Sequence, residues 1–305
     1  MSLLIEQTLN GVQLGLLLFL VAAGLTLVFG IMDFMNLSHG SLFMMGAYFA
    51  ATFVALTGSF VLGGVLAIIC TTLLGFAIEA IWLRPLFGRG HLDQVLGTFG
   101  LVLFFNDFVR LVWGAAGRTL AVPQMLAGHV SFGAFTYPVY RLVLIAVGLL
   151  VAADLYLLVQ RTKIGMIIRA AASDRDMASA IGADVTLVSA FVFGLGAALA
   201  GLAGLFAAPL LTVQIGKGDN ILVLALVIIV IGGLGSVRGA FFAALVVGLI
   251  DALGRAYLPQ LLRLILSPVA ASTAAGSLSS VAIYILLAFV LLVKPQGLFP
   301  ARGAR

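Results

Sequence analysis

The sequence predicts an all-α polytopic membrane protein: one domain over residues 1–305, with about eight to nine transmembrane helices, glycine-rich breaks and a short cytoplasmic coupling helix. Of its 305 residues, 63% are hydrophobic and only 9% are charged. No water-soluble domain presents so much apolar surface. Apolar stretches repeatedly reach the roughly 20 residues that a spanning helix needs, which favours helices over a barrel. The 36 glycines suit close helix packing in lipid.

Apolar runs define the expected elements in chain order. Residues 1–8 contain Glu6 and no basic residue, so we expect them to be retained rather than cleaved as a signal peptide. The runs cover about 9–30, 41–56, 60–83, 95–113, 139–159, 187–211, 221–231, 241–253 and 278–293. The mixed segments 114–138 and 257–277 are expected on the outer surface, and a surface turn is expected at Lys217, Asp219 and Asn220.

Lysines and arginines in the short loops predict the orientation in the membrane. One side carries Arg84, Arg89, Arg161, Lys163, Arg169, Arg175, Lys294, Arg302 and Arg305. The opposite side carries Arg118, Lys217, Arg255 and Arg263. We therefore expect the central loop and the C-terminus in the cytoplasm and the N-terminus outside. The net charge of +5 is modest, and the basic residues lie at the ends of the apolar runs. This pattern indicates that they set the orientation in the membrane rather than bind nucleic acid.

The central loop, about residues 161–186, is the most strongly charged stretch of the chain. Ser173 and the acidic Asp176 three residues later predict the start of a short helix, and Gly182 its end. A helix of about two turns is unstable alone in water, so it must pack on something. This segment is either a solvated loop or a docking element for a soluble partner. The residues expected to couple to such a partner are Arg169, Ala172, Ser173, Asp174, Asp176, Met177, Ala178, Ile181 and Gly182.

Two polar, glycine-containing breaks interrupt apolar stretches. The first holds Asn36, Ser38, His39 and Gly40, and the second holds Gly232, Gly233, Gly235 and Ser236. Irregular backbone at membrane depth is tolerated only where protein or a water-filled cavity surrounds it. Discontinuous helices of this kind often form substrate sites near the midplane. Both breaks are therefore either parts of a substrate path, facing one another, or ordinary cytoplasmic turns between spans.

The sequence lacks the motifs of several classes of enzyme and binding site. It contains no G-x-x-x-x-G-K-[ST], H-E-x-x-H or G-x-S-x-G motif, and its single Cys70 excludes a disulfide framework or a thiolate metal site. The chain is not expected to bind ATP, a metal or another cofactor itself. Asp33, Glu79, Asp107, Asp154 and Asp251 lie near the ends of apolar runs, whereas ion-coupled transporters usually keep carboxylates mid-span. A permease driven by a separate motor and a passive or ion-coupled transporter both remain open, and an intramembrane enzyme is a distant third.

Four motifs carry a resemblance to a known family. They are GLTLVFGIMDFMNLSHGSLFMMGAYFA (Gly24–Ala50), RAAASDRDMASAIGADV (Arg169–Val185), IGGLGSVRGAFFAALVVGLI (Ile231–Ile250) and KPQGLFP (Lys294–Pro300). In this order they resemble the LivH-type permeases of branched-chain amino acid ABC importers. Ala170–Ala172 and Gly182 match the small residues of the coupling motif of such permeases. Arg169 precedes those alanines, where many importers carry a glutamate.

The resemblance implies a multi-pass subunit of the bacterial inner membrane, surrounded by lipid. It would pair with a second, LivM-like permease, two cytoplasmic ATPase subunits that use ATP and magnesium, and a periplasmic substrate-binding protein. Branched-chain or other hydrophobic amino acids are the expected cargo. Importers of amides, urea and aromatic acids share the resemblance and remain alternatives.

Overall fold

The computed structural model describes residues 2–32, 34, 36–132 and 135–299, and confirms an all-α membrane architecture. Asp33, Pro300, Arg302 and Arg305 lie outside the described residues. Eight of the described helices are long and apolar enough to cross a membrane. They are α1 (Ser2–Met32), α2 (His39–Thr57), α3 (Phe60–Ile78), α4 (His91–Trp113), α5 (Val139–Arg161), α8 (Val185–Ala207), α10 (Val237–Leu262) and α11 (Pro268–Val293). The shorter helices include α6 (Lys163–Ser173), α7 (Arg175–Ala180) and α9 (Lys217–Gly232).

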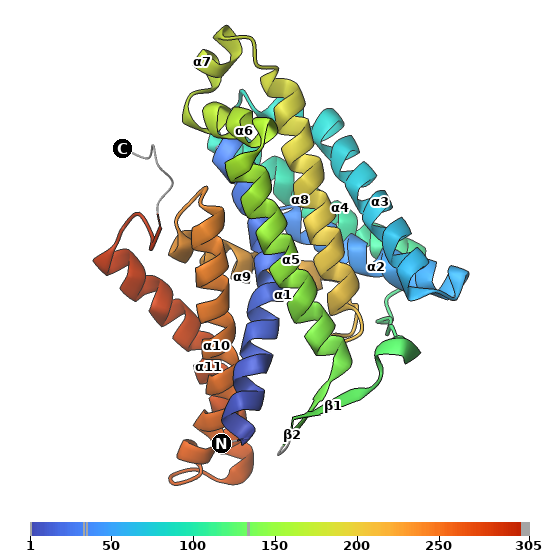
Figure 1. The fold of residues 1–305 in the computed structure, drawn as a ribbon, viewed down its shortest axis with the longest axis vertical. Helices are drawn as coiled ribbons and strands as arrows, with labels where there is room; N and C mark the ends of the chain where they lie inside the picture. Colours follow the sequence, from blue (N-terminus) through green and yellow to red (C-terminus); the bar gives the residue numbers. More distant parts are fainter. Residues whose placement is uncertain (1, 33, 35, 133–134, 300–305) are drawn as a thin grey trace.

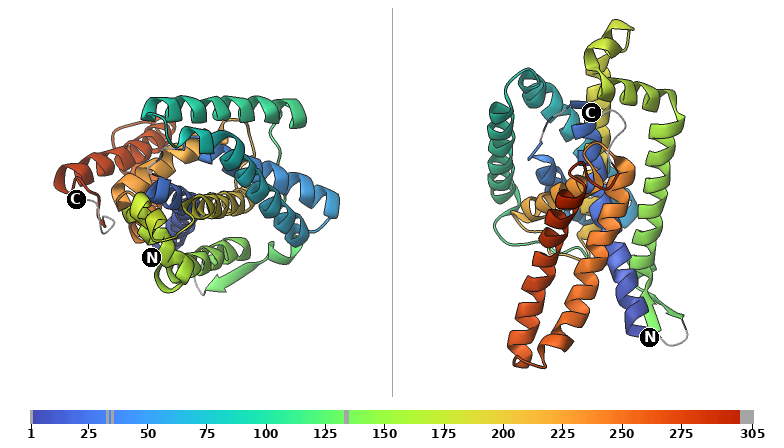
Figure 2. Two further views of the ribbon diagram at one scale, coloured as in Figure 1. Left: turned by 90° about the horizontal axis from the view of Figure 1, so that it is seen from above. Right: turned by 90° about the vertical axis from the view of Figure 1, so that its left-hand side faces the viewer.

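Helix α1 forms the centre of the bundle (Figures 1 and 2). It packs against α10, α8, α9 and α5, and most of its apolar side chains are buried. Its 31 residues span about 46 Å at 1.5 Å per residue, more than the roughly 30 Å of a hydrocarbon core. Figure 1 places the N-terminus at one end of the bundle and α6, α7 and the C-terminal segment at the other, which we call the α7 end.

Glycines allow the central helices to approach closely. A Cβ on Gly24 of α1 would lie 2.9 Å from the carbonyl oxygen of Gly196 in α8, and a Cβ on Gly46 of α2 would lie 2.5 Å from Cα of Gly201. Real Cβ atoms do not approach other atoms so closely, so larger residues would force these helices apart. The small-residue run of 194–209 therefore positions α8 against both α1 and α2.

Helix α3 continues through a π-helical turn, η1 (Glu79–Leu83), into the 3₁₀ turn η2 (Arg84–Leu86). The buried Glu79 carboxylate accepts hydrogen bonds from Arg84, at 2.8 Å from Nη2 and 3.3 Å from Nε. The side chain of Gln94, in the first turn of α4, donates to the carbonyls of Leu86 and Arg89. These contacts hold the α3–α4 turn in place.

The two mixed segments differ in structure. Residues 114–138 do not span: they contain the 3₁₀ turn η3 (Gln124–Leu126) and an antiparallel hairpin of β1 (His129–Phe132) and β2 (Phe135–Pro138). Residues 257–277, in contrast, are largely helical, because α10 runs on to Leu262 and α11 begins at Pro268. These residues therefore extend two of the long helices, and only 263–267 connect them. The hydroxyls of Ser272, Thr273, Ser277 and Ser280 donate to carbonyls of their own helix, which makes this stretch compatible with a helix.

Candidate transport path and coupling site

The first break, at Asn36–Gly40, brings the start of α2 to the middle of the bundle. His39 is fully buried, and its Nε2 lies 3.2 Å from the carbonyl oxygen of Val21 in α1. Val21 lies 11 residues before Met32, or about 16 Å along the axis, near half the thickness of a bilayer core. The chain after α1 therefore turns back into the bundle before α2 starts. Figure 1 shows α2 running from there across the long axis.

Helix α9 begins at the same depth as α2. A Cβ on Gly40 would overlap the carbonyl oxygen of Gly218, and a Cβ on Gly218 would overlap that of Gly40. The two helix N-termini thus meet inside the bundle. The free N–H groups and dipole of a helix N-terminus favour negative charge. The prediction of a surface turn at Lys217, Asp219 and Asn220 is wrong, because these residues form the first turn of α9. Gly218 between them is buried, and Asn220 is exposed.

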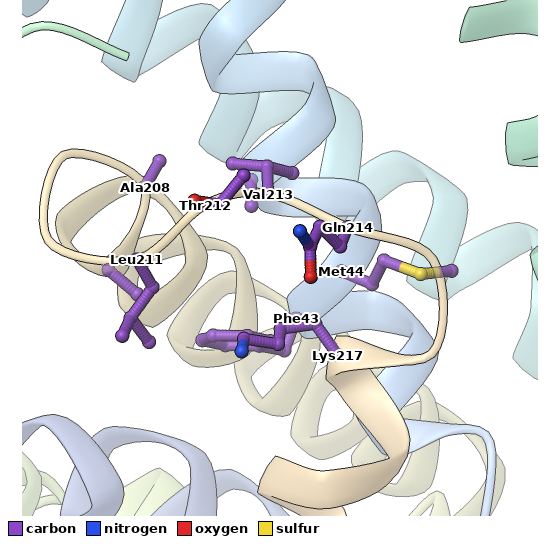
Figure 3. A pocket seen from close by; sticks show the side chains of 10 residues that line it. Phe43, Met44, Ala208, Leu211, Thr212, Val213, Gln214 and Lys217 are labelled. Atoms are coloured by element: carbon purple, nitrogen blue, oxygen red, sulfur yellow. The ribbon is translucent and has the colours of Figure 1, made fainter. Parts of the chain in front are cut away.

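Polar side chains surround the start of α9. Asn106 of α4 accepts a hydrogen bond from the Gly216 N–H at 3.2 Å and donates one to Asp219 at 3.3 Å. A small pocket adjoins this turn, between α2 and residues 207–217 (Figure 3). Seven apolar residues and three polar ones line it: Phe43, Met44, Ala47, Ala207, Ala208, Leu211 and Val213, and Thr212, Gln214 and Lys217.

In and beside the first break, only some of the polar side-chain atoms have hydrogen-bond partners. Asn36 Oδ1 accepts hydrogen bonds from the N–H and the hydroxyl of Ser38, at 3.0 and 2.6 Å. Asn36 Nδ2, His39 Nδ1 and Ser41 Oγ are buried and have no hydrogen-bond partner among the described residues. Most buried polar groups in proteins are paired. These three atoms leave hydrogen-bonding capacity free beside the meeting point of α2 and α9.

The second break, at Gly232–Ser236, is a tight turn at the α7 end. Gly233 and Gly235 have φ of +106° and +75°, a region that residues with a Cβ rarely adopt. The Ser236 hydroxyl caps α10 by accepting from the Gly239 N–H. Gly218 and Gly232 are 14 residues apart in α9, or about 21 Å. The structure therefore does not bring His39 and Gly40 together with Gly232, and these residues of the two breaks do not face one another.

The C-terminal segment closes this turn. The N–H groups of Leu298 and Phe299 donate to the carbonyls of Ile231 and Gly232, at 2.8 and 2.9 Å. These carbonyls belong to the last turn of α9, where no intrahelical partner is available. The Phe299 ring also packs against Phe242 of α10, with centroids 5.4 Å apart. The glycine turn and the KPQGLF motif thus form one structural unit.

Helix α6 joins α7 to the bundle. It lies across the end of the bundle (Figure 2) and packs on α5 and α1. Its start is fixed by Thr162, whose hydroxyl accepts from the Gly165 N–H at 3.0 Å. Arg169 donates to the carbonyl of Val159 at the end of α5. Arg169 therefore holds the α5–α6 corner, while Ala172 and Ser173 lie exposed at the end of α6.

Helix α7 begins one residue later than predicted. Asp174, not Ser173, is the N-cap, and its carboxylate accepts from the Met177 N–H at 2.9 Å. Ser173 is instead the last residue of α6. Gly182, with φ of +93°, follows the helix as predicted. Asp176 occupies the first turn, where an acidic side chain favours the helix dipole.

Three apolar residues in and just after α7, Met177, Ala178 and the C-cap Ile181, do not share one environment. Ala178 is buried against the bundle, whereas Met177 and Ile181 are 61% and 75% exposed. Their spacing in the sequence predicts one shared face of a helix, but Ala178 faces the bundle and the other two side chains do not. Met177 and Ile181, four residues apart, form an exposed apolar pair on a protruding element (Figure 1).

Sequence reasoning missed Gly218, Lys217 and Asn106 as neighbours of the first break. One signal was present: the apolar run 221–231 is too short to cross a bilayer. Such a run indicates a helix that starts at membrane depth. The partners of that helix depend on contacts between residues more than 100 positions apart, which no local pattern reveals.

Comparisons with known proteins agree with this architecture. The family model described as "Branched-chain amino acid transport system / permease component" matches residues 7–292. The chain is 30% identical to the permease protein LivH of Escherichia coli, over 96% of this chain and 94% of that protein. It is also 30% identical to BraD of Pseudomonas aeruginosa, over 82% and 86%, and 27% identical to a probable LivH of Methanocaldococcus jannaschii, over 79% and 78%.

A solved structure shares the fold. The structure described as PsaBC from Streptococcus pneumoniae in complex with Fab superimposes with a TM-score of 0.51, covering 94% of this chain and 91% of that chain. At 11% identity this likeness concerns the fold alone. The family model covers nearly the whole chain, and two relatives reach 30% identity over most of it. The chain therefore belongs to the family of branched-chain amino acid transport permease components.

Proposed function

We propose that this chain is a transmembrane permease subunit of an ATP-driven (ABC) importer for branched-chain or other hydrophobic amino acids. Family membership and the names of the relatives support the transport role and this class of cargo. The observation that carries the proposal is α7, a short capped helix that protrudes from the bundle and exposes an apolar pair. A permease that is driven by a separate motor needs such an element.

In this proposal the α7 end faces the cytoplasm, and ATPase subunits bind α6 and α7. Met177 and Ile181 would enter an apolar groove of the motor, and the charged residues around them would form the rim of the contact. A partner can shift a conformational equilibrium only if it binds the two states with different affinity. The ATPase must therefore hold α7 differently in the inward- and outward-facing states. ATP and magnesium would be bound by those partners rather than by this chain.

The proposed path passes the meeting point of α2 and α9. Two helix N-termini there favour a carboxylate, and the apolar lining contributed by Phe43 and Met44 favours an aliphatic side chain. Asn36, Ser38, His39 and Gly40 belong to this path. Gly232, Gly233, Gly235 and Ser236 form the capped turn at the α7 end, which supports a structural role for them. A second, LivM-like permease would complete the path, and a periplasmic binding protein would deliver the amino acid.

The docking role of α7 is tested by co-purification. Met177→Asp and Ile181→Asp should each lower the recovery of ATPase subunits at least about tenfold, because burying an unpaired carboxylate costs well over 1.4 kcal/mol. The matched control is Met125→Asp, on a side chain that is 90% exposed in η3, outside α6 and α7. All three variants should melt at the same temperature as the parent, since none of these side chains is buried. Unchanged recovery of ATPase subunits with both α7 variants would contradict the proposal.

A further inference from the structure

The side chain of Phe87 lies between Arg175 of α7 and Phe34, which is close to the first break. The Arg175 guanidinium carbon lies 5.9 Å from the centre of its ring, and the ring of Phe34 meets it edge-to-face with centroids also 5.9 Å apart. Arg175 is the first residue of α7, and Phe34 belongs to the chain between α1 and α2. We propose that Phe87 is a positioning residue that links movement of α7 to movement of this α1–α2 connection.

The contact on the α7 side is sensitive to small displacements. A cation interacts usefully with an aromatic face only within about 6 Å of the ring centre, and Arg175 lies at that limit. Arg175 also contacts the Ser189 hydroxyl, at 3.5 Å from Nη2. Interactions at these distances weaken steeply as the groups separate. A shift of α7 by about 1 Å would therefore separate Arg175 from the ring.

Phe87 belongs to a turn that hydrogen bonds hold in place. It directly follows η2, in the turn that is held by the Glu79–Arg84 pair and by the two hydrogen bonds of Gln94. Phe87 is half-buried and packs against the core. A side chain on so constrained a turn can reorient only with its neighbours. It is therefore suited to pass on a displacement rather than absorb it.

On the other side of Phe87, Phe34 connects directly to the interior of the bundle. Phe34 is fully buried, and Asn36, Ser38 and His39 follow within five residues. His39 contacts Val21 at mid-depth, and Gly40 touches the start of α9. Packed interiors transmit displacement because they contain few voids. A movement of Phe34 would therefore reach the point where α2 and α9 meet.

This inference rests on the proposed function, because it takes α7 as the element that the ATPase moves. The test uses the complete complex in lipid nanodiscs, with Cys70→Ser and a new thiol at the half-buried Leu37→Cys. The measured quantity is the rate at which this thiol reacts with a small maleimide, with and without ATP and vanadate. In the parent, ATP and vanadate should change the rate at least about fivefold, a typical size for coupling between sites.

Phe87→Leu and Arg175→Gln should each reduce that change to less than about twofold, whereas Phe87→Trp and Arg175→Lys should keep most of it. ATP hydrolysis should persist in the two Phe87 variants, because Phe87 lies outside α6 and α7. Phe99→Leu, at an exposed phenylalanine of α4, is the matched control and should behave as the parent. A full ATP response in both Phe87→Leu and Arg175→Gln would overturn the link, and so would a parent thiol that does not respond although the ATPase is bound. Loss of ATPase binding is scored separately, by co-purification, and concerns the proposed function alone.

Discussion

At the scale of single residues, the centre of this bundle depends on glycines that face one another. Gly40 and Gly218 touch through their backbones, so the first turns of α2 and α9 occupy space that any side chain would need. In a membrane, such close approach replaces the hydrophobic effect as a source of helix association. The same contact sets the depth at which α9 begins.

Gly40→Ala should therefore destabilise the protein. The added Cβ would overlap the carbonyl oxygen of Gly218, and overpacking of this kind typically costs about 1–3 kcal/mol. We expect the melting temperature of the purified protein in detergent to fall by several degrees. Gly100→Ala in α4 is the control, because a Cβ there meets open space and alanine favours a helix by about 1 kcal/mol over glycine. Equal melting temperatures for the two variants would mean that α2 and α9 can separate freely.

At the scale of elements, the sequence predicted helices well where apolar runs end at charges. Helix α5 was expected at 139–159 and covers Val139–Arg161, since Arg161 and Lys163 mark its end. Helix α3 starts at Phe60 as expected. The predicted run 221–231 missed the first turn of α9, because that turn is polar. The depth at which α9 begins depends on its contact with Gly40, which the sequence does not show.

The sequence predicted the N-cap of α7 only to within one residue. Both Ser173 and Asp174 can cap a helix, and local sequence does not decide between them. The structure selects Asp174, since α6 continues through Ser173. The role of the C-terminal segment was not predictable at all. It depends on hydrogen bonds between residues 298–299 and 231–232, which lie far apart in the sequence.

This C-terminal closure gives a prediction at the element scale. Gly233→Ala should destabilise the turn for two reasons: alanine is strained at φ +106°, and its Cβ would lie 2.9 Å from the Phe299 carbonyl oxygen. Gly58→Ala is the matched control, because Gly58 also has positive φ but meets nothing within 4 Å. Gly58 is left-handed, where alanine costs about 1–2 kcal/mol. Gly233, with ψ of +125°, lies outside that region, in a conformation that residues with a Cβ rarely adopt. Only Gly233→Ala should accelerate hydrogen exchange at the Leu298 and Phe299 amides.

At the scale of the whole molecule, the lysines and arginines of the described residues are distributed unequally between the two ends of the bundle. The α7 end holds Arg84, Arg89, Arg161, Lys163, Arg169, Arg175, Arg238 and Lys294. Towards the other end lie Arg110, Arg118, Arg141, Arg255 and Arg263. Lys217 belongs to neither group, because it lies at the start of α9 within the bundle. Lysine and arginine in short loops favour the cytoplasmic side, so we expect the α7 end to face the cytoplasm.

Cysteine labelling in intact cells tests this orientation. Ser173→Cys at the α7 end and Thr119→Cys at the other end are both exposed, whereas Gly218 is buried and unsuitable. In a Cys70→Ser background, an impermeant maleimide should label Thr119→Cys at once and Ser173→Cys only after the membrane is permeabilised. The Cys70→Ser parent, which has no other cysteine, controls for background. The reverse pattern would place α7 outside the cell, where no ATPase could reach it, and would contradict both the orientation and the proposed coupling.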